Sequence, residues 1–344
     1  MKALVYRGPR TLALEEVGRP AVLPDEVLLR VDATGICGSD VHGYLGVTGR
    51  RIPPMIMGHE FCGTVMEVGS EVEGVRPGDR AAVAPVMSCG ACEACRGGHV
   101  YLCASRRLFG VMACNGSMAD YLNVPARLLF PMPGAMPPEV GAMVEPSAVA
   151  LHALSRAGVI EGATVLIVGA GPIGLLLTGL SRRRHPRVLL VSDLSDLRLE
   201  LARRMGADVI INPAREDVAT VVAEHTGSQG VDLSFEAVGA APTVEQALSA
   251  LRPRGTCVWV GNSQKTISVD MQASVTRELA ILGSYTYTLA EFGEAVQILA
   301  RGDVDVRPII TRIAPLEEGP AMFAALSDPA AGLVKVVLER RGGA

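Results

Sequence analysis

The run "VLIVGAGPIG" at residues 165–174 constrains the fold of this chain more than any other feature. It places Gly169, Gly171 and Gly174 in a G-x-G-x-x-G pattern that follows an apolar strand and opens a helix. The first glycine permits a tight turn, the second lets the backbone approach a pyrophosphate, and the third lets the helix pack on the strand. Because any tight strand-to-helix turn favours glycine, the pattern indicates dinucleotide binding only in a suitable context.

That context is an alternation of strand-like and helix-like patterns, which begins at about residue 150. The expected strands cover residues 164–169, 187–193, 208–211, 231–236, 256–261 and 280–284. Helical patterns lie between most of them, and such alternation is typical of an α/β fold with a parallel, doubly wound sheet of the Rossmann type. We therefore expect the second half of the chain to bind a dinucleotide.

The second expected strand ends at Asp193, where the adenine ribose of a dinucleotide should lie. A carboxylate there can accept hydrogen bonds from both ribose hydroxyls of NAD and would repel the 2′-phosphate of NADP. The nearest cation is Arg198, five positions on, so the sequence predicts NAD. The alternative is that Asp193 merely caps the next helix. The expected cofactor-binding residues are Gly169, Gly171, Pro172, Ile173, Gly174, Asp193 and Arg198.

The first 135 residues have a different pattern, with short strands broken by glycine and proline. Strands are expected within residues 11–17, 26–36, 61–72, 79–86 and 119–133. They predict a mainly antiparallel, barrel-like β domain with long loops. The tail from residue 290 shows two helical segments and a closing strand at 333–339, which we expect to pack on this first domain.

Four of the eight cysteines lie in the lobe at residues 88–104. Their spacing is C-x2-C-x2-C-x7-C, which lets four thiolates converge on one zinc ion. An iron–sulfur cluster is the main alternative. Disulfides and a redox pair are disfavoured by the expected reducing compartment and by the number of cysteines. Four protein ligands leave no open position, so a zinc ion held by Cys89, Cys92, Cys95 and Cys103 is expected to be structural.

Composition excludes some classes of partner. The chain has 344 residues, a net charge of −4 and a pI near 5.9, so a polyanion-binding surface and a nucleic-acid partner are not expected. Residues 162–181 carry no charge, but their glycines and proline indicate a buried strand, turn and helix instead of a membrane span. No signal peptide is expected at the N-terminus, so the protein is predicted to be soluble and cytoplasmic.

A second candidate metal site is spread over the first domain. "GICGSDVHG" offers Cys37, Ser39, Asp40 and His42, "PMIMGHEFCG" offers His59 and Glu60, and "AMVEPSAVALHAL" offers Glu145. Each residue also has an ordinary structural interpretation, as a small core residue, a turn histidine or a carboxylate at a helix start. Their joint presence beside a cysteine cage and a dinucleotide fold favours the metal site.

Taken in order, "GICGSDVH", "GHEFCG", the cysteine lobe, "EPSAVALHA" and "GAGPIG" resemble the zinc-dependent medium-chain dehydrogenases over essentially the whole chain. Glu145 and "TRELAILGSYTY" are similar to the sorbitol and polyol dehydrogenase branch, and the threonine dehydrogenase branch is also close. The resemblance implies a GroES-like catalytic domain at 1–148 and 287–344, a Rossmann domain at 149–286, and homodimers or homotetramers.

The resemblance also assigns roles. It makes Cys37, His59 and Glu60 ligands of a catalytic zinc, and Glu145 either a fourth ligand or the partner of a zinc-bound water. Ser39 and His42 match positions that relay the alcohol proton to solvent. Two zinc ions per chain are therefore expected, and the three-ligand site is formally neutral. The extra cysteines, Cys62, Cys114 and Cys257, are expected to be buried small apolar residues.

Three functions follow from these features. The leading one is an NAD-dependent dehydrogenase that oxidises a secondary alcohol of a polyol, sugar alcohol or cyclitol to the ketone. The second is the same chemistry on L-threonine, a vicinal diol or a polyol phosphate. The third is a non-catalytic nucleotide-binding relative, which the intact set of Cys37, His59, Glu60 and Glu145 disfavours.

Overall fold

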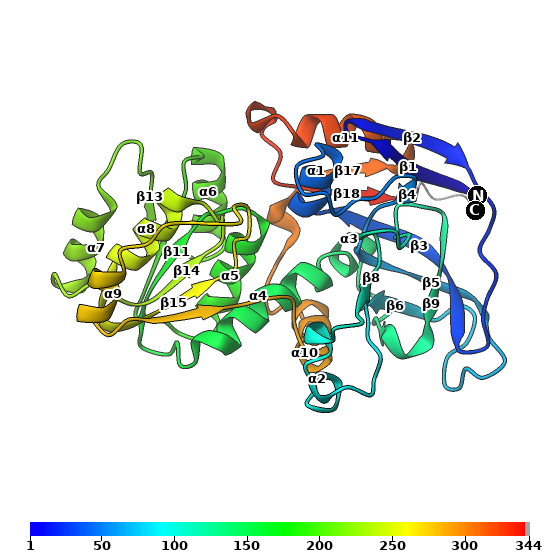
Figure 1. Ribbon diagram of the computed structural model, residues 1–344, viewed down its shortest axis with the longest axis horizontal. Helices are drawn as coiled ribbons and strands as arrows, with labels where there is room; N and C mark the ends of the chain where they lie inside the picture. The colour runs from blue at the N-terminus through cyan, green and yellow to red at the C-terminus, as the bar shows by residue number, and fades with distance from the viewer. Residues whose placement is uncertain (341–344) are drawn as a thin grey trace. The chain divides into compact units, whose positions relative to one another are not determined.

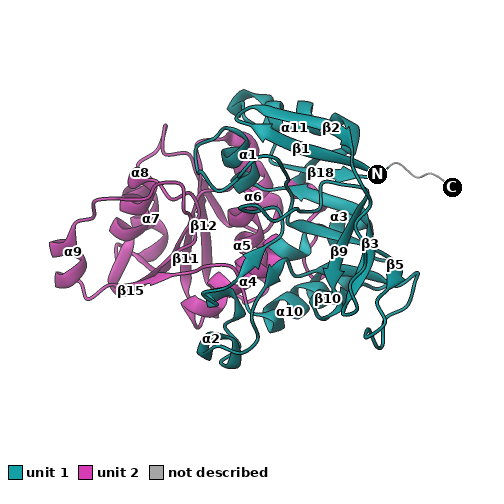
Figure 2. Cartoon of the chain, turned by 45° about the vertical axis from the view of Figure 1, so that its right-hand side comes forward, with its two compact units in different colours: residues 1–145, 288–302, 310–344 teal, residues 146–287, 303–309 magenta. Residues whose placement is uncertain are grey.

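The computed structural model describes residues 1–340 and divides the chain into two compact units. The first unit comprises residues 1–145, 288–302 and 310–344, and the second comprises residues 146–287 and 303–309 (Figure 2). The last four residues of the predicted catalytic domain, 341–344, lie outside the described part of the chain.

The second unit is built on a six-stranded parallel sheet in the order β13-β12-β11-β14-β15-β16 (Figure 1). The strands are β11 (Thr164–Val168), β12 (Val188–Ser192), β13 (Val209–Ile211), β14 (Val231–Glu236), β15 (Leu251–Trp259) and β16 (Ala280–Gly283). The order runs outward from β11 in one direction and from β14 in the other, which confirms the predicted doubly wound α/β class. All five residues of β11 are buried, as expected for a strand at the centre of a parallel sheet.

Helix α4 (Val144–Ala157) leads into this sheet. The helices that connect its strands are α5 (Pro172–Arg182), α6 (Asp196–Arg204), α7 (Val218–Thr226), α8 (Ala241–Ser249) and α9 (Met271–Thr276). The uncharged residues 162–181 form β11, a turn and most of α5, as predicted. Within residues 1–340, no helix combines the length and the apolar character that a membrane crossing requires.

One strand of this sheet is longer than predicted. β15 begins at Leu251, five residues before the expected start at 256, because Leu251 pairs with Val231 ahead of a register shift. Pro253 and Gly255 lie between these positions, and both residue types are uncommon in the interior of a strand. The irregular pairing at this point allows the strand to include them.

The first unit contains the mainly antiparallel sheets. Its strands are β1 (Lys2–Gly8), β2 (Thr11–Glu16), β3 (Glu26–Ile36), β4 (Met55–Ile56), β5 (Glu60–Val68), β6 (Arg80–Val83), β7 (Val86–Met87), β8 (Arg107–Leu108), β9 (Tyr121–Pro125), β10 (Leu129–Pro131), β17 (Ile310–Pro315) and β18 (Lys335–Glu339). Its helices are α1 (Gly38–Tyr44), α2 (Glu93–Arg96), α3 (Pro138–Gly141), α10 (Leu289–Ala300) and α11 (Gly319–Leu326).

Strand β3 organises this unit. It pairs with β5 along one edge, and with β9 and then β18 along the other. The tail therefore returns to the first unit through β18, as predicted. The sequence did not predict β17, which pairs in parallel with β18 at the end of this sheet. The predicted strand at 119–133 is divided into β9 and β10 after Pro125, which has no N–H to continue the ladder.

Candidate metal centre and dinucleotide site

Three predicted zinc ligands converge at the ends of two neighbouring strands. Cys37 follows the last residue of β3, and His59 and Glu60 lie at the start of β5. Gly35 stands opposite Glu60 in the antiparallel pairing, so the end of β3 lies beside the start of β5. One ligand atom from each of the three residues lies within 4.8 Å of the other two, and His59 and Glu60 are buried. A thiol, an imidazole and a carboxylate at this separation are donors that suit zinc.

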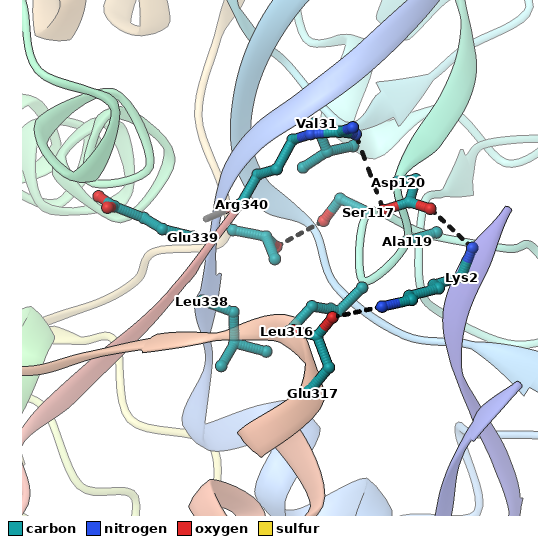
Figure 3. A pocket seen from close by; sticks show the side chains of 11 residues that line it. Lys2, Val31, Ser117, Ala119, Asp120, Leu316, Glu317, Leu338, Glu339 and Arg340 are labelled. Carbon is teal, nitrogen blue, oxygen red and sulfur yellow. Dashed lines mark hydrogen bonds and ion pairs between the residues drawn. The ribbon is translucent and has the colours of Figure 1, made fainter. Parts of the chain in front are cut away.

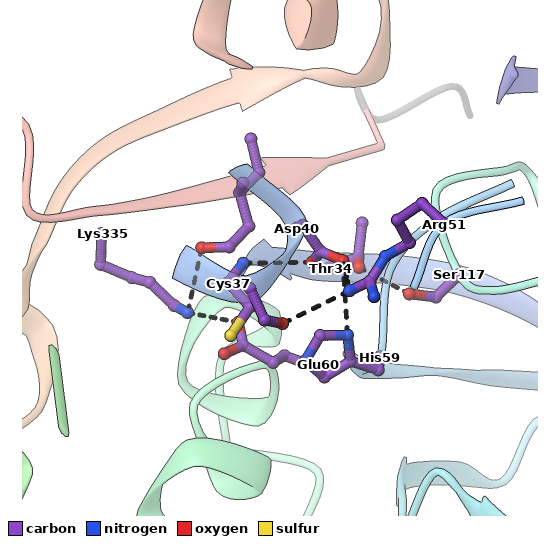
Figure 4. Close-up of polar contacts among 10 residues, drawn as sticks. Thr34, Cys37, Asp40, Arg51, His59, Glu60, Ser117 and Lys335 are labelled. Carbon is purple, nitrogen blue, oxygen red and sulfur yellow. Dashed lines mark hydrogen bonds and ion pairs between the residues drawn. The ribbon is translucent and has the colours of Figure 1, made fainter. Parts of the chain in front are cut away.

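Buried Asp40 faces the imidazole of His59 (Figure 4). Its Oδ1 lies 3.6 Å from Nδ1 of His59. Burial alone lowers the pKa of His59, but the Asp40 carboxylate and the Cys37 thiol outweigh it and hold this pKa well above its usual range. Burial likewise raises the pKa of Asp40, but His59 and Arg51 hold it well below its usual range. A metal-binding histidine commonly has such a carboxylate on its other ring nitrogen, which fixes the ring orientation.

Lys335 is a member of this site that the sequence analysis missed. Its Nζ forms an ion pair with the Glu60 carboxylate and donates to the Ile36 carbonyl at 3.3 Å (Figure 4). The side chain is 1% exposed, and β18 brings it here by pairing Val336 with Ile36. Burial alone would lower the pKa of Lys335, but the negative charges of Glu60 and Cys37 outweigh burial, so this pKa is raised above its usual value. A lysine within the apolar strand "LVKVVLE" is the signal that could have revealed it.

Lys335 adds a charge next to the predicted ligands. The prediction counted Cys37 and Glu60 as two negative charges that neutralise a zinc ion, and that count concerns the three ligands alone. The ammonium group of Lys335 lies outside this set and places one positive charge against Glu60.

The remaining predicted residues lie around this cluster in different ways. Ser39 and His42 are exposed on α1, and the Ser39 Oγ accepts a hydrogen bond of 3.3 Å from Nη2 of Arg51. Glu145 is the second residue of α4 and is 7% exposed. It lies outside the set of three converging ligand atoms, but its charge contributes, after Glu60 and Cys37, to the raised pKa of Lys335.

The four lobe cysteines also converge. The Sγ–Sγ distances are 3.4 Å for Cys92–Cys95, 3.6 Å for Cys103–Cys89 and 3.9 Å for Cys89–Cys95.

The backbone N–H groups of Ala91 and Cys92 lower the pKa of the Cys89 thiol to about 6, which favours the thiolate that a metal requires. Four sulfur atoms in one group match the donor set of a closed structural zinc site.

The glycine-rich turn between β11 and α5 leaves space for a ligand to approach its backbone closely. Gly169 has a φ of +95°, and a Cβ at Gly174 would overlap the Gly169 carbonyl. At Gly171, which precedes α5, a Cβ would meet no atom within 4 Å, so this side of the turn is open. Pro172 and Ile173 form the first turn of α5, whose N-terminus favours an anion. These features fit a pyrophosphate.

Asp193 lies beside this turn. Its Oδ2 accepts a hydrogen bond of 2.7 Å from the N–H of Ala170, and its Oδ1 accepts one of 2.8 Å from the N–H of Ser195. The N-cap of α6 is Ser195, so capping of that helix does not account for Asp193. Arg198 lies 3.9 Å from the same carboxylate.

Two pockets of the first unit contain none of the predicted site residues. One has a volume of about 240 Å³ and is lined by Lys2, Thr34, Ser117, Asp120, Glu317 and Arg340 among others (Figure 3). The other has about 350 Å³ and lies beside β1 and β4. The donor chemistry of the buried cluster, rather than the volume of either pocket, makes the cluster the candidate site.

Comparison with known families agrees with this donor chemistry. Residues 23–134 match the family described as Alcohol dehydrogenase GroES-like domain, and residues 172–301 match the family described as Zinc-binding dehydrogenase. The chain belongs to the zinc-binding alcohol dehydrogenases. It is therefore an oxidoreductase, and the predicted family and GroES-like fold are confirmed.

Three relatives of this dehydrogenase act on hydroxylated substrates. L-idonate 5-dehydrogenase of Vitis vinifera is 39% identical over 88% of this chain and 85% of its own length. Sorbitol dehydrogenase of Bacillus subtilis is 34% identical over 92% of this chain and 91% of its own length. L-threonine 3-dehydrogenase of Pyrococcus abyssi is 39% identical over 87% and 86%.

Among solved structures, a zinc-binding dehydrogenase of Sinorhizobium meliloti bound to NADP is 35% identical to this chain. It covers 98% of both chains with a TM-score of 0.91. This chain therefore shares its fold, over that length, with a protein that binds NADP.

Proposed function

We propose that this dehydrogenase oxidises a secondary alcohol of a polyol, sugar alcohol or cyclitol, with NAD as the acceptor. The carbinol carbon gives a hydride to NAD⁺, the hydroxyl gives a proton to solvent, and the products are a ketone and NADH. The observation that carries the proposal is the convergence of Cys37, His59 and Glu60 in a buried group, in a chain related to L-idonate and sorbitol dehydrogenases.

In this proposal Cys37, His59 and Glu60 hold a catalytic zinc ion, which when bound lowers the pKa of a hydroxyl group at its open position. Lys335 holds Glu60 in place and adds a buried positive charge next to it. This charge favours loss of the hydroxyl proton, because the anion that remains is attracted to it. Glu145 serves as a fourth ligand or as the partner of a water molecule, and its position at the buried start of α4 supports a role next to the cluster.

Ser39 and His42 are proposed to pass the proton to solvent. Both are exposed on α1, within five residues of Cys37, so each can exchange protons with water. Cys89, Cys92, Cys95 and Cys103 are proposed to hold a second, structural zinc ion, which gives two zinc ions per chain.

The preference for NAD is proposed from Asp193. Its carboxylate can accept the ribose hydroxyls of NAD, while a 2′-phosphate there would meet a like charge. Like-charge contact costs several kcal/mol, which corresponds to roughly 100- to 1,000-fold in selectivity. The NADP-bound relative makes this part of the proposal important to test.

The cofactor test combines Asp193→Ser with Leu194→Arg, because Leu194 is 72% exposed and an arginine there has room. We expect the wild type to prefer NAD strongly in kcat/KM and the double variant to lose most of that preference. Leu194→Arg alone is the control, since it adds the cation and keeps the carboxylate. A wild type that favours NADP would contradict this role of Asp193.

A homodimer or homotetramer is proposed from the sheet of the second unit. β16 ends the strand order, so within the described residues its outer edge has no partner strand. Met271 and Val275, on the preceding helix α9, are 73% and 65% exposed. An edge strand can pair with a second copy, and a two-fold axis would place the two β16 strands together. Sedimentation should show an oligomer that Met271→Glu with Val275→Glu weakens.

We also propose the domain boundaries 1–148 with 287–344, and 149–286. The division into units with boundaries at 145/146 and 287/288 supports them, although residues 303–309 belong to the second unit.

The decisive experiment is a panel of polyols, cyclitols, vicinal diols, polyol phosphates and L-threonine, each with NAD, followed by the absorbance of NADH. We expect the highest kcat/KM with a polyol or cyclitol, and two zinc ions per chain by metal analysis. L-Threonine is the second candidate, because a threonine dehydrogenase is as similar to this chain as the idonate enzyme. Turnover of L-threonine alone would overturn the polyol proposal, and absence of turnover with one metal per chain would support a binding protein.

A further inference from the structure

The Arg51 side chain joins two groups near the metal site that the sequence analysis did not connect. Its Nη2 donates to Oδ1 of Asp40 at 2.7 Å and to Oγ of Ser39 at 3.3 Å (Figure 4). The side chains of Arg51 and Asp40 are 2% and 0% exposed. Hydrogen bonds between charged groups are strong where water is excluded, so this contact holds α1 firmly against the segment that contains Arg51.

The same carboxylate touches two of the predicted ligands. Oδ1 of Asp40 lies 3.6 Å from Nδ1 of His59, and Oδ2 accepts a hydrogen bond of 3.3 Å from the backbone N–H of Cys37. A shift of Asp40 would therefore move the imidazole of His59 and the backbone that carries the Cys37 thiol. Arg51 makes the shortest of these contacts with the Asp40 carboxylate and therefore restrains it.

The fold makes room for Arg51 at one glycine. The aliphatic part of the Arg51 side chain lies against Gly43 of α1, where a Cβ would overlap Cγ of Arg51. Glycine within a helix is less favourable than alanine, and Gly43 has no positive φ that would require it. The backbone on either side of Arg51 is held by hydrogen bonds between Ile52 and Met112 and between Met112 and Arg50.

We propose that Arg51 is a positioning residue of the metal centre. It acts through Asp40 on the ring of His59, and through Ser39 on the hydroxyl that the proposed function uses for proton transfer. The inference rests on the proposed function in one respect, that Cys37, His59 and Glu60 hold a divalent metal ion.

The test is metal binding by Arg51→Met, with Arg50→Met as the matched control because Arg50 is exposed and adjacent. Zinc dissociation constants are measured by competition with a chromophoric chelator, and the cobalt-substituted protein is examined by absorption spectroscopy. The cobalt bands that Cys37→Ser removes belong to the cluster. We expect Arg51→Met to bind this zinc ion roughly 10- to 100-fold more weakly, with shifted cobalt bands. Arg51→Lys should recover part of the affinity.

A wild-type zinc dissociation constant and cobalt spectrum in Arg51→Met would overturn the proposal. If that variant does not fold, Gly43→Ala displaces the guanidinium without removing its charge and should shift both readouts in the same direction. Unchanged readouts in a folded Gly43→Ala would then overturn the proposal. If the wild type binds two metal ions but oxidises no member of the panel, the proposed function is wrong. The role of Arg51 in metal binding can then still be measured in the same way. A wild type without a metal at the cluster overturns both.

Discussion

The two candidate metal sites of the first unit are built in opposite ways. The cysteine cage takes all its ligands from residues 89–103, and three of its four cysteines are at least partly accessible. The cluster of Cys37, His59 and Glu60 takes its ligands from two strands, and its charge partner Lys335 comes from a third. Its His59, Glu60 and Lys335 are buried.

This difference indicates that the cysteine cage serves stability and that the cluster of Cys37, His59 and Glu60 serves chemistry. A local cage with four thiols can hold a loop in one conformation without help from distant residues, and it has no open position for a substrate. A site whose ligands lie at strand ends receives fixed charges from the sheet around it, here the carboxylate of Asp40 and the ammonium group of Lys335. The following predictions test this contrast.

The largest effect is expected from Cys37→Ser. Loss of the thiolate removes one ligand of the proposed catalytic zinc, so kcat should fall by at least ~100-fold, since metal stabilisation of the reaction is worth several kcal/mol. The melting temperature and NAD binding should remain close to wild type. Metal analysis should show one zinc ion per chain instead of two. Wild-type turnover together with wild-type metal content would exclude Cys37 as a ligand.

The next effect is expected from Lys335→Met, and it should depend on the metal. Removal of one partner of a buried ion pair leaves an unpaired charge and costs about 3–5 kcal/mol. In metal-free protein the free energy of unfolding should therefore decrease by about that amount. In zinc-loaded protein the decrease should be smaller, because the metal ion neutralises Glu60. Denaturant unfolding with and without a chelator measures both values, and equal losses in the two states would contradict the assigned contact between Lys335 and the metal centre.

A smaller effect is expected from Cys95→Ser. The lobe should lose its metal ion and the stability that the ion provides, which lowers the melting temperature by roughly 5 °C, at about 2–4 °C for each kcal/mol lost. The soluble fraction should keep its second zinc ion and most of its turnover. Cys114→Ser is the control, because Cys114 lies outside both metal groups. Unchanged metal content in Cys95→Ser would contradict the four-thiolate site.

The smallest effect concerns the reactivity of the thiols after chelation. Cys89, with a pKa lowered to about 6, should be mostly thiolate at pH 7 and react first with iodoacetamide. Its labelling rate should rise from pH 5 to pH 7 and then level off, because the thiolate fraction saturates above its pKa. Cys257 should not react, since burial raises its pKa to about 12. Mass spectrometry of the labelled peptides checks the order, and earlier labelling of Cys92, whose pKa is raised to about 11, would contradict it.

The extent to which the sequence predicted this structure follows from how local each feature is. The cysteine cage and the glycine-rich turn are encoded within about ten to fifteen residues, so spacing alone indicated them. The strand at 26–36 was predicted over its full observed length, because its apolar residues are bounded by clear turn signals. Strand β17 and the early start of β15 were missed, since both depend on pairing with distant strands.

The distinction between local and long-range features also explains which residues of the candidate site could be predicted. The motifs of the sequence suggested Cys37, His59 and Glu60 as a metal site, the resemblance made them ligands of one zinc ion, and their convergence in the structure supports that set. The resemblance did not supply Lys335, whose ammonium group contacts a residue 275 positions away in the sequence. Asp40 was among the candidate residues of the sequence, but nothing connected it with Arg51, because an arginine near a turn is usually exposed. Only the folded chain shows that both are buried.

The position of Lys335 in the last strand also affects how the protein is made. The polypeptide is synthesised from its N-terminus at about 5–20 residues per second, and domains generally fold as units. Residues 146–287 therefore emerge together and can form their sheet while the first unit still lacks β17 and β18. The unit that begins the chain is thus the one completed last. Until β18 pairs with β3, Glu60 lacks the ammonium group of Lys335, so the candidate metal site of the nascent chain has one positive charge fewer beside it than in the finished protein.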